Sequence, residues 1–174
     1  LNGTRNALDP DAIDQAATLL QRARQVFCFG QGGSSLLASD IWARFATIST
    51  KFHTSGDSHM QAIAASLMGP EDVVLFVSYS GATRDMMDTL RLAKDNGAKV
   101  ILLTHYDDAP GTALADVVLL CGAKESPLDS GSMPVKLAVL FVANVLVLRY
   151  TLDNQELVSL SRERTTKALG NKLL

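Results

Sequence analysis

The sequence has few aromatic residues, few charged residues and no excess of basic residues, and each shortage excludes a class of protein. Aromatic residues make up 6% and charged residues 20% of the 174 positions, whereas 47% are hydrophobic, so the core must be built mainly from Ala, Leu and Val. This composition does not favour disorder. A net charge of −2 lacks the basic footprint of a nucleic-acid binder, so we do not expect this chain to bind DNA by itself.

Cysteines and long apolar runs are also scarce. Cys28 and Cys121 both lie in apolar segments, and neither their number nor their spacing fits a disulfide framework or a metal site. We therefore expect no metal and a reducing, cytoplasmic setting. The longest apolar run, Leu137 to Leu148, is interrupted by Asn144 and is too short to cross a bilayer, so it predicts a buried helix and no membrane contact.

Five short apolar segments alternate with amphipathic segments along the chain. The apolar segments predict strands at residues 26–29, 51–53, 73–77, 99–104 and 117–121. The amphipathic segments predict helices at 10–23, 36–45, 58–68, 83–96, 134–150 and 154–169. This alternation predicts an α/β fold: one domain with a five-stranded parallel sheet in the flavodoxin-like order 2-1-3-4-5 and helices on both faces.

The third predicted strand runs directly into a cluster of hydroxyl groups. Ser78, Ser80 and Thr83 supply O–H donors, and Gly81 allows the backbone to turn sharply. The predicted helix that follows adds the positive end of its dipole, so the segment is suited to binding an anion. The alternative is that Ser80 or Thr83 only caps this helix by accepting a hydrogen bond from its free N–H groups.

The first predicted strand also ends in an unusual loop, at residues 30–35. In the order 2-1-3-4-5 the first and third strands are neighbours, so this loop is expected beside residues 78–83, at the point where ligands bind such sheets. The loop begins like a dinucleotide fingerprint, but its sixth position is Ser35 and no acidic residue ends the second strand. A Walker-type Gly-Lys-Ser/Thr sequence is also missing. We therefore expect neither a dinucleotide nor another cofactor.

These two loops resemble those of sugar isomerase (SIS) domains, which bind phosphosugars. Residues 29–34, with Ala38 and Asp40, resemble the first SIS loop, and residues 78–83 resemble the S-x-S-G-x-T loop. The resemblance covers about residues 9–170. Further residues look like the effector domain of RpiR-type bacterial transcriptional regulators: Asp57, Ser58, His59, Met60, Gln61, Ala93, Lys94, Gly97, Ala98, Ala115, Asp116 and Glu125.

The resemblance implies a phosphosugar site made by both loops. Ser78, Ser80 and Thr83 would hold the phosphate, and Ser34 and Ser35 would complete the cradle or touch the sugar. The same loops add Gly32, Gly33, Tyr79 and Gly81 to the expected site. Two residues outside the loops are candidates for sugar contacts, namely His59, which is equally well explained as a surface or capping histidine, and Glu125.

An aldose–ketose isomerase needs a positioned base that moves a proton between adjacent carbons. In several SIS isomerases this base is a Glu near the start of the helix after the fifth strand. The corresponding residues here, 130–136, contain no acid, while Glu125 and Asp129 lie earlier in the loop. We therefore expect a phosphosugar sensor without catalytic residues, and a stand-alone phosphosugar isomerase is the alternative.

The resemblance also implies partners. A sugar phosphate effector, a homodimer or tetramer, and DNA contacted only through an N-terminal helix-turn-helix domain outside residues 1–174 are expected. The chain begins with Leu1 rather than Met, as expected for a piece of a longer polypeptide. The predicted helix at 134–150 is apolar on more faces than one sheet can cover, which favours a homodimer.

Overall fold

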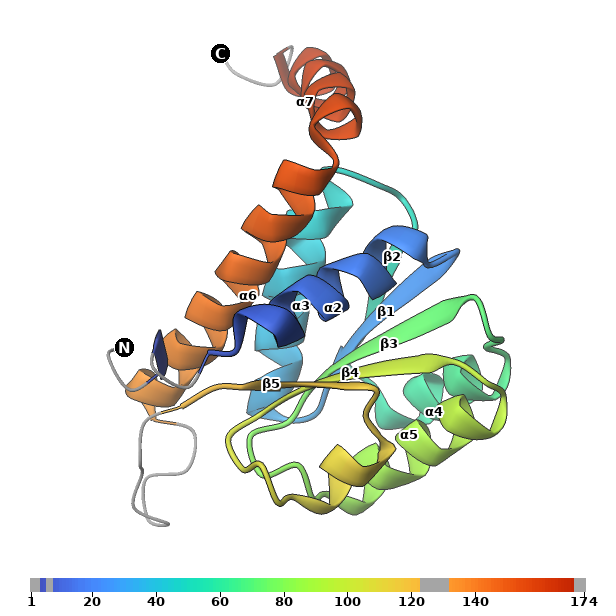
Figure 1. Cartoon of the computed structure of the whole chain (residues 1–174). Helices are drawn as coiled ribbons and strands as arrows, with labels where there is room; N and C mark the ends of the chain where they lie inside the picture. The colour runs from blue at the N-terminus through green and yellow to red at the C-terminus, as the bar shows by residue number, and fades with distance from the viewer. Residues whose placement is uncertain (1–3, 6–7, 123–131, 171–174) are drawn as a thin grey trace.

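The computed structural model describes residues 4–5, 8–122 and 132–170. Strands and helices alternate along the chain, as the hydrophobic pattern predicts (Figure 1). The strands are β1 (Gln25–Gly30), β2 (Phe52–Ser55), β3 (Asp72–Val77), β4 (Lys99–Thr104) and β5 (Val117–Leu120). The helices are α2 (Pro10–Arg22), α3 (Gly33–Ala46), α4 (Ser58–Ser66), α5 (Arg84–Asp95), the 3-10 helix η1 (Pro110–Leu114), α6 (Met133–Asp153) and α7 (Gln155–Gly170).

The strands form one parallel sheet in the order β2-β1-β3-β4-β5, which confirms the predicted topology. In the register of β1 and β3, Gly30 is paired with Val77. The two central strands therefore end at the same level of the sheet. Because their following loops start from neighbouring positions, the β1–α3 loop and the β3–α5 loop meet at the carboxyl edge.

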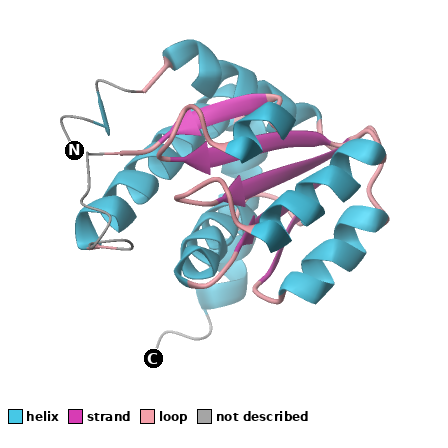
Figure 2. Cartoon of the chain, turned by 90° about the horizontal axis from the view of Figure 1, so that it is seen from below, coloured by secondary structure: helices cyan, strands magenta, loops and turns pink. Residues whose placement is uncertain are grey.

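Helices cover both faces of the sheet (Figure 2). Helices α2, α3 and α6 pack on one face, and α4 and α5 on the other (Figure 1). Strand β3 shows why both faces need a cover. Val73, Leu75 and Val77 belong to the core beneath the first group of helices, whereas Val74 and Phe76 belong to the core beneath the second. Every residue of β3 is buried, as expected for a central parallel strand.

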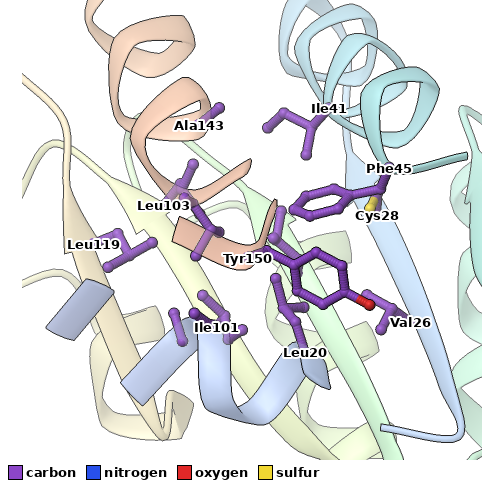
Figure 3. Close-up of a cluster of buried hydrophobic side chains, with 14 of the residues drawn as sticks. Leu20, Val26, Cys28, Ile41, Phe45, Ile101, Leu103, Leu119, Ala143 and Tyr150 are labelled. Carbon is purple, nitrogen blue, oxygen red and sulfur yellow. The ribbon is translucent and has the colours of Figure 1, made fainter. Parts of the chain in front are cut away.

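The larger core is anchored by three aromatic rings. Phe45 of α3 stacks on Phe52 of β2 with ring centroids 4.5 Å apart, and Tyr150 of α6 meets Phe45 edge-on at 5.3 Å. Figure 3 shows Tyr150 and Phe45 among the aliphatic side chains of this cluster. These contacts hold α3 and the far end of α6 on the sheet, and so they fix the direction in which both helices approach its carboxyl edge.

Helix α6 is longer than predicted, running from Met133 to Asp153. Its length and composition would allow it to cross a membrane, but core helices of soluble proteins also meet that criterion, and one side of α6 packs into the larger core. Several of its leucines nevertheless face solvent, as do some on α7: Leu137, Leu148, Leu152, Leu157 and Leu160. In Figure 1, α7 continues from the end of α6 beyond the sheet.

Helix α3 begins earlier than the hydrophobic pattern predicts. The pattern suggests a start near Leu36, but the helix starts at Gly33, with Gly32 as its N-cap. Ser34 and Ser35 therefore belong to the first helical turn and not to a loop. Small and polar residues are common in a first turn, where the backbone N–H groups have no intrahelical acceptor, so their presence does not delay the helix.

Candidate functional site

A cavity of about 350 Å³ opens at the carboxyl edge of the sheet, where the loops after β1 and β3 meet the start of α6. Three segments far apart in the sequence thus form one concave site, at the place that parallel-sheet topology predicts for a ligand. The residues that line it are Gln31, Gly33, Ser34, Leu37, Phe76, Val77, Ser78, Tyr79, Ser80, Thr83, Val135, Lys136 and Val139.

The β3–α5 loop is held in place by hydrogen bonds from its neighbours. The carbonyl of Tyr79 accepts bonds from Thr104 Oγ1 and from the backbone N–H of His105, both at 3.1 Å. Gly81 turns the chain at a φ of +59°, and an added Cβ would lie 2.6 Å from the Cβ of Ala109. Only glycine fits this position, so the loop geometry is fixed before any ligand arrives.

The hydroxyls of Ser78 and Ser80 act as acceptors within this loop. Ser78 Oγ accepts a bond from the backbone N–H of Gly81 at 3.2 Å, and Ser80 Oγ accepts one from the N–H of Ala82 at 3.4 Å. Among the described residues, neither hydroxyl donates its own proton to another group. Both protons are therefore available to an acceptor in the cavity.

Thr83 bears directly on whether this loop is only a helix cap. Thr83 occupies the N-cap position of α5, but its side chain makes no capping hydrogen bond. Its hydroxyl instead donates to Oε1 of Gln31, 3.1 Å away in the β1–α3 loop. The first N–H groups of α5 have no intrahelical acceptor, as at every helix start. The geometry thus resembles a prepared anion site more than a capped helix.

The β1–α3 loop reaches the cavity through a close contact of its own backbone. A Cβ on Gly30 would lie 2.5 Å from the carbonyl oxygen of Ser34, so glycine is required where β1 turns into α3. Gly33 and Ser34 line the cavity. Ser35 does not, and its hydroxyl donates to the carbonyl of Gly32 at 2.7 Å.

Lys136 also lines the cavity, although the sequence pattern did not single it out. It lies in the first turns of α6, and among the described residues it has no carboxylate within ion-pairing distance. A cation near a helix N-terminus is opposed by the helix dipole. This unfavourable position was the signal in the sequence that could have identified Lys136 as a ligand-binding residue.

The remaining candidates lie elsewhere. His59, the second residue of α4, lines a separate hollow with Asp85 and Asp88 of α5. Gly32 and Gly81 shape the loops without lining the cavity. Glu125 lies outside the described residues.

No Asp, Glu or His occurs among the described residues that line the cavity, so this part of the site contains no evident base.

No described group of three His, Cys, Asp or Glu residues could hold a metal ion. The two cysteines are fully buried, and burial raises the pKa of both Cys28 and Cys121 from 9.0 to about 12. Because the thiolate is the form that binds metals and reacts with electrophiles, both side chains behave as small hydrophobic residues of the core.

The chemistry of the described lining residues limits the class of ligand that fits the cavity. Hydroxyl-bearing residues (Ser34, Ser78, Ser80 and Thr83), Gln31 and one cationic residue, Lys136, belong to the lining beside the start of α5. The same lining has an apolar part, here called the apolar wall, that includes Leu37, Val135 and Val139. Such a site suits a ligand with an anionic end and a larger, less polar body, and it offers the anion charge-assisted hydrogen bonds.

Comparisons with known proteins agree with this geometry. The model of the SIS domain family matches residues 19–149. The chain is 31% identical over 161 residues to the HTH-type transcriptional regulator RpiR of Escherichia coli K12, covering 92% of this chain and 54% of that protein. It is 34% identical over 155 residues to the HTH-type transcriptional regulator HexR of Pseudomonas aeruginosa, covering 87% of this chain and 53% of that protein.

Among solved structures, the fold is similar to the Vibrio vulnificus NanR protein complexed with ManNAc-6P. The TM-score is 0.93 at 25% identity, over 99% of this chain and 65% of that one. The resemblance to SIS domains seen in the two loop motifs, and the resemblance to RpiR-type regulators seen in residues outside them, are thereby confirmed. The chain spans little more than half the length of the two regulators that it matches in sequence.

Proposed function

This chain belongs to the SIS domain family, and from that premise we propose that it is the effector-binding domain of a bacterial transcriptional regulator and that it binds a sugar phosphate. One observation carries the proposal. Ser78, Ser80, Thr83 at the N-cap of α5 and Lys136 all line one cavity whose described lining has no carboxylate. Such a set of donors is suited to a phosphate group.

The sugar occupies the rest of the cavity. The phosphate lies against the β3–α5 loop, where Ser78, Ser80 and Thr83 donate to it. Ser34 and Tyr79 border the sugar, and the apolar wall covers its less polar face. The ManNAc-6P complex of the Vibrio vulnificus NanR protein supports a sugar phosphate as the class of effector.

DNA binding belongs to a separate part of the whole protein. The relatives are regulators of the helix-turn-helix type and are almost twice as long as the segment that matches this chain. The net charge of −2 gives residues 1–174 no excess of positive charge of the kind that DNA binding favours. We infer that an N-terminal helix-turn-helix domain contacts DNA, that sugar phosphate binding alters this contact, and that the protein works in the cytoplasm.

The domain binds its effector without converting it. Isomerisation requires a base within hydrogen-bonding reach of carbon 2, and no acid or histidine is found among the described residues lining the cavity. We therefore expect proton NMR in deuterated water to show hexose phosphate binding without exchange of the proton on carbon 2. Deuterium incorporation that is lost in the Glu125→Gln variant would favour the alternative function, a phosphosugar isomerase.

The domain also assembles with itself. The exposed leucines of α6 and α7 would leave a large apolar surface in water, and surfaces of this kind usually mark an interface. We expect a homodimer or a tetramer, and light scattering at micromolar concentration should give two or four times the mass of the chain. A monodisperse monomer would contradict this part of the proposal.

A further inference from the structure

Gln31 connects the two loops that form the candidate site. It follows Gly30 at the end of β1, and it is half-buried in the cavity wall. Its Oε1 accepts the hydroxyl proton of Thr83 at 3.1 Å, across from the other loop. The sequence places this residue within the first loop motif but does not reveal its contact with Thr83, because that contact depends on the pairing of β1 with β3.

The other end of the Gln31 amide lacks a partner. Its Nε2 atom is buried and makes no hydrogen bond to any described residue. Leaving a buried donor unpaired costs about 1–3 kcal/mol, and buried polar groups in folded proteins nearly always have partners. An apolar side chain of the same length would fill the space without this cost. The amide is therefore explained best by a partner that enters the cavity.

Thr83 adds a constraint, because its hydroxyl has only one proton. While this proton is donated to Oε1 of Gln31, the Thr83 oxygen can present only lone pairs to an incoming phosphate. Turning the Gln31 amide by 180° removes the conflict. Nε2 then donates to Thr83 Oγ1, and the Thr83 proton is free for the phosphate. Oε1 takes the former place of Nε2, which is buried in the cavity wall, so a small shift of the side chain toward the cavity is needed for Oε1 to accept a bond from a sugar hydroxyl.

We propose that Gln31 is a specificity-determining residue that links phosphate binding at Thr83 to recognition of a hydroxyl group on the sugar. This inference rests on the proposed function. It assigns Gln31 to the sugar and not to the phosphate, so the site distinguishes a sugar phosphate from inorganic phosphate through this side chain. The two ligands share the β3–α5 loop, and only one of them reaches the Gln31 amide oxygen.

Two variants separate the roles of the amide. Gln31→Met keeps the length of the side chain but removes both polar ends, which frees the Thr83 proton. Inorganic phosphate should then bind within about 3-fold of the parent, whereas the sugar phosphate should bind about 10-fold more weakly, as expected for one lost hydrogen bond. In Gln31→Glu, the carboxylate accepts a hydrogen bond from Thr83 in either orientation and adds a negative charge to the site. The affinity for both ligands should therefore fall by about 100-fold.

The experiment compares inorganic phosphate, followed by phosphorus NMR, with a panel of glucose 6-phosphate, fructose 6-phosphate and N-acetylmannosamine 6-phosphate, followed by calorimetry. Gln15→Glu, on the exposed surface of α2, is the matched charge control and should bind like the parent. If Gln31→Met loses the same affinity for inorganic phosphate as for the sugar phosphate, or loses affinity for neither, the inference is overturned. A parent that binds none of the panel would overturn the proposed function and this inference with it.

Discussion

Replacing Lys136 with glutamate is expected to weaken sugar phosphate binding by about 100-fold or more without lowering the stability of the fold. The substitution removes the one cation among the described residues that line the cavity and places a carboxylate beside the phosphate. Like charges brought together at a binding site cost several kcal/mol, which corresponds to this loss of affinity.

Stability should be maintained because Lys136 is exposed and has no ion-pair partner among the described residues. A negative charge near the start of α6 also suits the helix dipole better than a positive one. The control is Lys167→Glu, which makes the same change of charge on exposed α7. Calorimetric titration should separate the two variants, and similar affinities in both would remove Lys136 from the site.

Replacing Ser80 with alanine is expected to weaken sugar phosphate binding by about 10- to 100-fold, the range for one lost hydrogen bond to a charged group. The ligand-free protein should melt close to the parent, because the Ser80 hydroxyl makes only a long bond of 3.4 Å within the described structure. A true capping hydroxyl would behave differently, since its loss costs about 1 kcal/mol of folding stability whether or not ligand is present.

Ser35→Ala is the matched control for Ser80→Ala. Ser80 lies in the β3–α5 loop and Ser35 in the first turn of α3, where its hydroxyl donates to the Gly32 carbonyl and does not line the cavity. We expect Ser35→Ala to keep the affinity of the parent, as measured by titration. If instead Ser35→Ala loses affinity and Ser80→Ala keeps it, the phosphate does not lie against the β3–α5 loop.

The sheet could be predicted because its signals are local. Each strand is a short apolar run, and the segments between strands carry helical periodicity, as in Val73–Val77 followed by Arg84–Asp95. Parallel pairing and strand order follow from this alternation and from the few topologies that it allows. The neighbouring position of the two loops then follows from the pairing of Gly30 with Val77.

The parts of the site that could not be predicted depend on contacts between distant segments. Lys136 is more than 50 residues from Thr83 in sequence and joins it only because α6 packs across the same face as α3. Gln31 lies within the first loop motif, but the hydrogen bond that it accepts from Thr83 could not be predicted from the sequence. Ser35 shows the opposite case, because its side-chain direction is set by the early start of α3, which a pattern of hydroxyls and glycines does not reveal.

The central claim is that this cavity recognises a sugar through its phosphate, and a thermal-shift comparison of one hexose phosphate with its dephosphorylated sugar tests it most directly. At 100 times the dissociation constant, a ligand that binds only the folded state adds about 2.7 kcal/mol of stability, which for a chain of this size raises Tm by about 5 to 10 °C. We expect the phosphate ester to give such a shift in the parent, much less in Ser80→Ala, and the free sugar to give none. Equal shifts from the ester and the free sugar, or an undiminished shift in Ser80→Ala, would contradict the account.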